Sequence, residues 1–137
     1  MNSPTIAPAL AGQVLGSIDN AFVVAEWRDA GGTSDPPRLI APRHVHHNDD
    51  EAWYVLEGTL RVLVGEDVVE ARAGSGVFVP KGTPHTYWNP SSEPVRYLLV
   101  MTKNIYRLIK EIHALDDRNP TALRAVFSKY DAELLES

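Results

Sequence analysis

The sequence of 137 residues contains no cysteine. A chain without thiols cannot form a disulfide, a thiolate zinc site or an iron–sulfur cluster, and it has no cysteine nucleophile. Any metal site in this protein must therefore be built from nitrogen and oxygen ligands. The five histidines and the 18 acidic residues are the side chains that can supply them.

Basic residues are also scarce, because 13 Lys and Arg are outnumbered by 18 Asp and Glu, which gives a formal net charge of −5. Binding to a phosphate backbone depends on clustered Lys and Arg, so we expect no nucleic-acid partner. No hydrophobic run approaches the roughly 20 apolar residues of a membrane helix. Residues 1–12 lack the basic and apolar regions of a signal peptide. We therefore expect a cytoplasmic protein with no membrane partner.

What the sequence does contain is a series of short apolar and β-branched runs separated by turn-forming residues. Their recurrence predicts an all-β barrel or sandwich in a single domain. Apolar and polar residues alternate on either side of Gly65, which predicts a hairpin there. The predicted strands are residues 22–27, 39–45, 53–56, 60–64, 68–71, 77–79 and 95–101.

The apolar period changes after residue 101. Isoleucine and leucine in residues 105–112 follow the three- and four-residue spacing of one helical face. A second helix is predicted to begin at Asn119, a favourable N-cap, with Pro120 at the first helical position and an apolar stripe that continues to Leu134. The predicted organisation is an N-terminal arm (1–12), a barrel (13–102) and a C-terminal helical extension (103–137).

Four of the five histidines lie in two clusters, of which the first is PRHVHHNDDE. His44 and His46 are two residues apart and point to the same face of an extended strand, whereas His47 points to the other face. Glu51 would lie on the wrong face if the strand continued straight. The polar residues 47–50 provide a turn that can bring Glu51 back alongside the histidines.

The second cluster is GSGVFVPKGTPHTYWN, residues 74–89. Gly82 permits a tight turn and Pro84 stiffens the chain before His85, so this histidine has a fixed position at the start of a strand. Three imidazoles and one carboxylate suit one divalent transition metal ion, either Fe, Mn, Co, Ni, Cu or Zn. Octahedral coordination would leave two open positions, as catalytic sites require. The candidate metal ligands are His44, His46, Glu51 and His85.

The two clusters resemble the paired motifs of the cupin superfamily, which implies a double-stranded β-helix, or jelly-roll, barrel. Only the glycine that often lies six residues before the first histidine is missing, because Arg38 stands there. This departure concerns an approach loop and leaves the ligand set intact. The matching positions are His44, His46, Glu51 and Gly58 in the first motif and Gly74, Pro80, Gly82, His85 and Asn89 in the second.

The set of three histidines and one glutamate resembles the metal centre of cupin dioxygenases, and the chain looks most like single-domain quercetinase-like proteins. The resemblance implies oxidation of a small hydroxylated or enolisable substrate, with Glu51 as the base. Tyr87 has the parity of His85 and is the second candidate catalytic residue. The other aromatic residues considered for a pocket or for the core are Trp53, Phe78 and Trp88.

Two alternative functions remain open. A cupin-type sugar phosphate isomerase would need cations inside the barrel, and the candidates on strands are Arg61, Arg72 and Arg96. A non-enzymatic metal-dependent module would bind a small ligand without turnover. Exposed edge strands favour a homodimer, for which we expect contacts through the first strand and the C-terminal helices.

Overall fold

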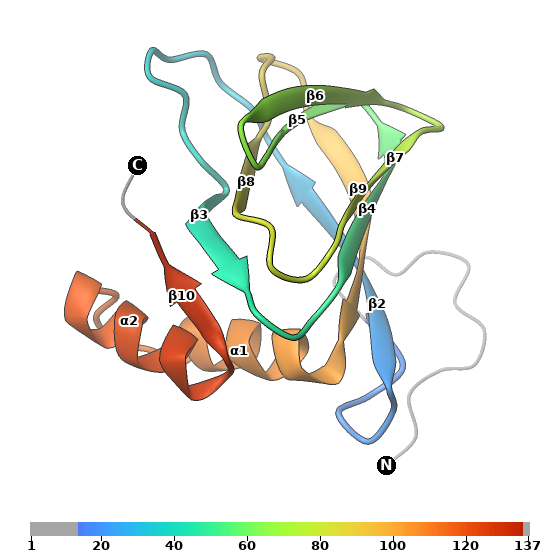
Figure 1. The fold of residues 1–137 in the computed structure, drawn as a ribbon. Helices are drawn as coiled ribbons and strands as arrows, with labels where there is room; N and C mark the ends of the chain where they lie inside the picture. Colours follow the sequence, from blue (N-terminus) through green and yellow to red (C-terminus); the bar gives the residue numbers. More distant parts are fainter. Residues whose placement is uncertain (1–13, 136–137) are drawn as a thin grey trace.

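Two antiparallel five-stranded sheets face one another in the computed structural model, which describes residues 14–135 (Figure 1). The first sheet has the order β1-β2-β9-β4-β7 and the second the order β10-β3-β8-β5-β6. This confirms the all-β class with C-terminal helices, while the predicted arm lies outside the described residues. The elements are β1 (Val14–Leu15), β2 (Phe22–Asp29), β3 (Ala41–His46), β4 (Glu51–Glu57), β5 (Thr59–Val64), β6 (Asp67–Arg72), β7 (Gly76–Val79), β8 (His85–Trp88), β9 (Val95–Thr102), α1 (Lys103–His113), α2 (Pro120–Lys129) and β10 (Ala132–Leu134).

The hydrophobic core lies between the two sheets. Along β9 every second side chain is buried, from Val95 to Met101, because successive residues of a strand point to opposite faces. β9 pairs with β2 on one side and β4 on the other, so its buried face is central to the first sheet. The second sheet contributes Leu60, Val62 and Ala71 to the same cluster.

Two turns require glycine at positions already noted in the sequence, Gly65 and Gly58. β5 and β6 form the predicted hairpin, in which Val64 pairs with Asp67 and Gly65 has a φ of 64°. Gly58 connects β4 to β5 with a φ of 80°, and a Cβ atom there would lie 2.5 Å from the carbonyl oxygen of Pro94. Only glycine fits this close approach between the β4–β5 turn and the start of β9.

The C-terminal helices begin where the sequence predicts. Thr102 caps α1 by accepting a hydrogen bond from the backbone N–H of Ile105, and Asn119 caps α2 in the same way. Neither helix is long and apolar enough to cross a membrane. The predicted helical stripe to Leu134 is wrong, because α2 ends at Lys129 and Leu134 pairs with His44 of β3. Residues 132–134 instead form strand β10, which pairs with the edge of β3 that would otherwise be unpaired.

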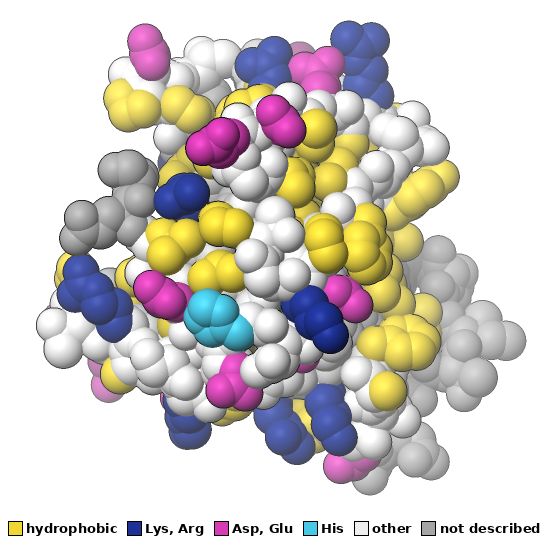
Figure 2. All heavy atoms as spheres, viewed as in Figure 1, with side chains coloured by type: hydrophobic (Ala, Val, Ile, Leu, Met, Phe, Trp, Pro, Cys, Tyr) yellow, Lys and Arg dark blue, Asp and Glu magenta, His cyan; other side chains and the backbone are white. Residues whose placement is uncertain are grey.

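The outer face of the first sheet carries a continuous apolar row. The pairing register aligns five residues, one from each strand, across the face that points away from the core. Figure 2 shows hydrophobic side chains gathered on the flank of the molecule where Figure 1 places β2, β4, β7 and β9. Phe22, Tyr54 and Phe78 on this face are 60%, 45% and 61% exposed. The row consists of Leu15, Val24, Val100, Ala52 and Phe78.

Replacing Val62 by alanine should lower the free energy of unfolding by about 2–3 kcal/mol, because this core side chain is fully buried and its loss leaves a cavity. Val68, in the same hairpin, is 56% exposed and is the matched control. Its replacement by alanine should change stability by less than about 0.5 kcal/mol. Urea unfolding followed by circular dichroism measures both values, and equal losses would contradict this assignment of the core.

Candidate metal centre and adjoining pocket

The four predicted ligands meet between the two sheets. His44 and His46 lie on β3, and His44 pairs directly with His85 of β8 in the second sheet. Glu51 begins β4, which belongs to the first sheet, so its carboxylate reaches the histidines from across the interior. All four residues are buried. Residues 47–50 therefore form a crossing between sheets, not a simple reversal within one sheet.

Hydrogen bonds hold both segments that present the ligands. The Lys81 backbone N–H donates to Asp50, and the Gly82 N–H donates to the His46 carbonyl oxygen at 2.7 Å. Asp49 accepts hydrogen bonds from Thr102 and from Asn104 at the start of α1. The two aspartates thus fix the turn and the helix instead of contacting a ligand imidazole.

Backbone carbonyl groups set the orientation of two imidazoles. Nδ1 of His44 lies 2.6 Å from the Pro42 oxygen, and Nδ1 of His85 lies 2.9 Å from the Thr83 oxygen. A carbonyl oxygen can only accept, so each Nδ1 carries the hydrogen and donates it. The Nε2 lone pair of each ring is consequently free and faces the centre, which is the arrangement typical of metal-ligating histidines.

The ligand atoms crowd together in a way that a cation would stabilise. His44 Nε2 is 3.1 Å from His46 Nε2, and Glu51 Oε1 is 3.1 Å from His85 Nε2. All four donor atoms lie within 4.8 Å of one another. Neighbouring ligands with metal bonds of about 2.1 Å are about 3 Å apart at right angles. His46 Nδ1 is buried and has no partner among the described residues, so nothing in residues 14–135 fixes that ring through Nδ1.

His44 and Glu51 are in the protonation states that bind a metal. Burial, together with the nearby His85 and His46, lowers the pKa of His44 to about 3. Burial alone would raise the pKa of Glu51, but the adjacent His46 and His85 rings outweigh it and hold that pKa at about 2. A neutral imidazole and an ionised carboxylate are the forms with free lone pairs. These four residues can therefore bind a metal ion.

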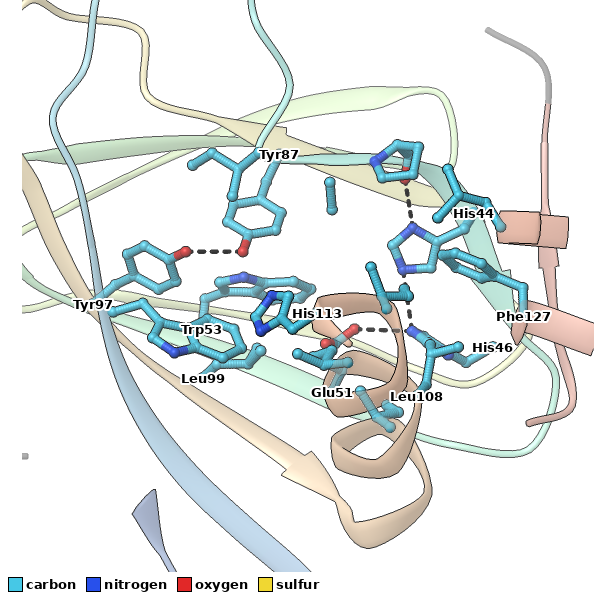
Figure 3. A pocket seen from close by; sticks show the side chains of 18 of the residues that line it. His44, His46, Glu51, Trp53, Tyr87, Tyr97, Leu99, Leu108, His113 and Phe127 are labelled. Carbon is cyan, nitrogen blue, oxygen red and sulfur yellow. Dashed lines mark hydrogen bonds and ion pairs between the residues drawn. The ribbon is translucent and has the colours of Figure 1, made fainter. Parts of the chain in front are cut away.

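A cavity of about 380 Å³ adjoins this centre (Figure 3). Its inner wall comes from the barrel and includes Trp53 and Tyr87, two of the aromatic residues singled out by the sequence. Phe78 points outward instead, and Trp88 lies against a different surface hollow. The outer wall of the cavity beside the metal centre comes from the C-terminal helices. It consists of Ile105, Leu108, Ile109, Ile112 and His113 of α1 and Leu123 and Phe127 of α2.

Several residues that line the cavity were not predicted from the sequence to do so. Tyr97 of β9 places its hydroxyl 2.9 Å from that of Tyr87, and Phe127 packs its ring 5.3 Å from His44. His113 is exposed but lies on the cavity face of α1, four residues beyond Ile109. The helical spacing could have revealed His113, whereas Arg118 and Phe127 depend on how the helices pack. His47 is exposed and lies 3.5 Å from Glu133, away from the centre.

Comparison with known proteins assigns the family. The sequence pattern of the cupin domain matches residues 33–101, just over half of the chain. This protein belongs to the cupin family. The match spans both histidine clusters and the strands that carry them.

Individual relatives share only the cupin part. The mannose-1-phosphate guanylyltransferase RfbM of Salmonella typhimurium is 33% identical over 42% of this chain, but that region is only 12% of the relative's length. A cupin-superfamily sugar phosphate isomerase from Silicibacter pomeroyi is 26% identical, with a TM-score of 0.52 over 61% of this cupin and 51% of the isomerase. The polyketide cyclase RemF of Streptomyces resistomycificus is also 26% identical, with a TM-score of 0.50 over 61% and 56% of the two chains.

Replacing His85 by alanine should abolish stoichiometric metal retention, because the centre loses one of its four ligands. We expect about one transition metal ion per chain in the unmodified protein by elemental analysis. His47→Ala is the matched control, since this neighbouring histidine is exposed, and it should retain the ion. Full metal content in His85→Ala would rule out this centre.

Proposed function

We propose that this cupin is a metal-dependent dioxygenase of the quercetinase-like type that acts on a small hydroxylated or enolisable organic substrate. The observation that carries the proposal is that a nitrogen–oxygen ligand set adjoins a largely apolar cavity. The cavity lies at the lower end of the size range of small-molecule pockets, about 300–1,000 Å³. A compact ring-bearing compound fits such a space better than a polymer or a peptide.

The walls of the cavity favour an apolar substrate body. Trp27, Trp53 and Leu99 line it from the first sheet, and Phe127 covers it from α2. The cationic candidates on strands do not contribute: Arg61 pairs with Glu70, and Arg96 lies between Glu26 and Glu57 on the outside of the barrel. Apolar walls exclude water from the substrate and leave few polar contacts to orient it.

His44, His46, Glu51 and His85 would hold the metal ion, which when bound would supply a Lewis-acidic centre for the substrate oxygen and for dioxygen. Among the described residues that line the cavity, Glu51 has the only carboxylate. It is therefore the group positioned to take the proton of a substrate hydroxyl. Tyr87 lines the same cavity and would orient the substrate.

The test is oxygen uptake after anaerobic mixing of substrate with the Fe, Mn, Co and Ni forms, using flavonols and β-diketones. We expect uptake in at least one form, and Glu51→Gln should lower kcat by about 100-fold or more because it removes the base. Glu57→Gln is the control, since this exposed carboxylate pairs with Arg96 outside the cavity. The absence of uptake in every combination would contradict a dioxygenase.

A sugar phosphate isomerase is the second candidate. Arg118 and His113 at the mouth of the cavity could meet a phosphate, and one similar structure is that of a sugar phosphate isomerase. The two arginines among the described residues that line the cavity, Arg28 of β2 and Arg118, are both exposed, which disfavours a phosphate buried within the barrel. Conversion of aldose phosphates under nitrogen by the same metal forms would favour the isomerase. Tight ligand binding without turnover would favour a non-enzymatic module.

We also propose that the protein is a homodimer, with a second copy covering the apolar row on the outer face of the first sheet. A twofold axis would stack this uncharged row on its own counterpart, and the aromatic side chains on the same face, Phe22, Tyr54 and Phe78, are typical of interface centres. The apolar faces of α1 and α2 pack on the barrel, as Leu108 and Phe127 are buried. We therefore assign the contact to this sheet, which includes the expected first strand, and not to the helices.

The double replacement Phe22→Ser and Phe78→Ser should convert the dimer to a monomer, because it removes the two most exposed phenylalanine side chains of this outer face. Light scattering coupled to size exclusion measures the mass. Val68→Ser, on the exposed face of the other sheet, is the control and should remain dimeric. A monomeric mass for the unmodified protein would contradict the proposal.

A further inference from the structure

Three aromatic side chains at one end of the cavity carry polar groups that the protein itself does not use. Figure 3 shows the hydroxyls of Tyr87 and Tyr97 turned toward one another, with Trp53 beside them. The two hydroxyl oxygens are 2.9 Å apart, and both residues are buried. The Trp53 indole nitrogen is also buried; it has no hydrogen bond of normal geometry with any described residue, although its N–H acts on the Tyr87 hydroxyl and partly offsets the rise in the pKa of that hydroxyl. All three side chains line the cavity.

The three side chains have more hydrogen-bond donors than the described part of the chain has acceptors for them. Each tyrosine hydroxyl has one hydrogen, and the single bond between the two hydroxyls uses only one of them. The second hydroxyl hydrogen has no acceptor in residues 14–135, and the indole N–H has none there with normal hydrogen-bond geometry. Burial raises the pKa of both tyrosines above its ordinary value, so both hydroxyls stay protonated. Buried donors without acceptors are rare in folded proteins and call for an explanation.

The donors lie apart from the metal centre but within reach of the same small molecule. The Trp53 ring is 5.2 Å from the Tyr87 ring on one side and 5.6 Å from the His85 ring on the other. About one aromatic side chain therefore separates the two polar regions. A ligand with oxygens on opposite sides of a ring system could contact both.

We propose that Tyr87, Tyr97 and Trp53 form an acceptor-binding subsite that receives a carbonyl or enolate oxygen of a ring-bearing ligand. The inference rests on the proposed function in one respect: a second oxygen of the same ligand is taken to bind at the histidine–glutamate centre. It narrows the ligand class to cyclic compounds that carry two separated oxygen functions. Tyr97 and Trp53 thereby become positioning residues, alongside Tyr87.

The test uses metal-free protein and two probes that differ by one carbonyl group, 1-tetralone and tetralin. Trp27 and Trp53 line the cavity, so binding should change the tryptophan fluorescence. The double replacement Tyr87→Phe and Tyr97→Phe should weaken 1-tetralone binding about tenfold, because it removes a buried hydrogen bond, and leave tetralin binding within about twofold. Single variants are less informative. When one tyrosine is replaced by phenylalanine, the hydroxyl of the other loses its partner and can donate its hydrogen to the ligand instead. Tyr54→Phe, on the outer face, is the matched control.

Infrared difference spectra give a second readout that needs no variant. The carbonyl stretch of bound 1-tetralone should shift to lower frequency than in an apolar solvent, as expected for an oxygen that accepts strong hydrogen bonds. An unshifted stretch, or equal 1-tetralone affinity in the double variant, would mean that only water meets these donors and would overturn the subsite. Because both measurements are made without metal or oxygen, failure of the dioxygenase assay leaves their outcome intact.

Discussion

The structure depends on gathering four hydrogen-bond acceptors inside an apolar interior. Pro42 and Thr83 accept the Nδ1 hydrogens of His44 and His85, so the lone pairs of these rings face the centre. The carboxylate of Glu51 adds a negative charge 3.1 Å from one of these lone pairs. Burying such groups without compensation is costly, and one shared cation would relieve the cost for all four. The pairing of β3 with β8 and the crossing to β4 are therefore as much part of the site as of the fold.

Local periodicity predicted the histidines well because their geometry is local. The two-residue spacing of His44 and His46 fixes a common face on any strand, and Pro84 fixes the entrance to His85. Glu51 is different, because its position depends on which sheet the next strand joins. The polar turn indicated a change of direction, but only the pairing of β4 with β7 and β9 decides that the carboxylate comes from the opposite sheet.

Long-range packing explains what the sequence left undetermined. Phe78 lies between two valines, so alternation alone separates it from them, yet the β4–β7 register is needed to know that Phe78 is outside. Leu134 continues a helical stripe by spacing, but the free edge of β3 takes it into a strand. The helical wall of the cavity has the same origin. Spacing identified the apolar face of α1, and only its docking on the barrel turns His113 toward the cavity.

Likeness of fold does not decide which ligand this cavity takes. The barrel aligns with that of a sugar phosphate isomerase over 61% of this chain. The cavity is set by other residues, chiefly Trp53, Tyr87 and Tyr97 within the barrel and Phe127 from α2. Phosphate recognition draws on Arg and Lys, whereas Arg61, Arg72 and Arg96 here are bound to carboxylates on the outside, and Arg28 at the cavity is exposed. The same barrel can thus serve another ligand class through side chains that leave the strand register untouched.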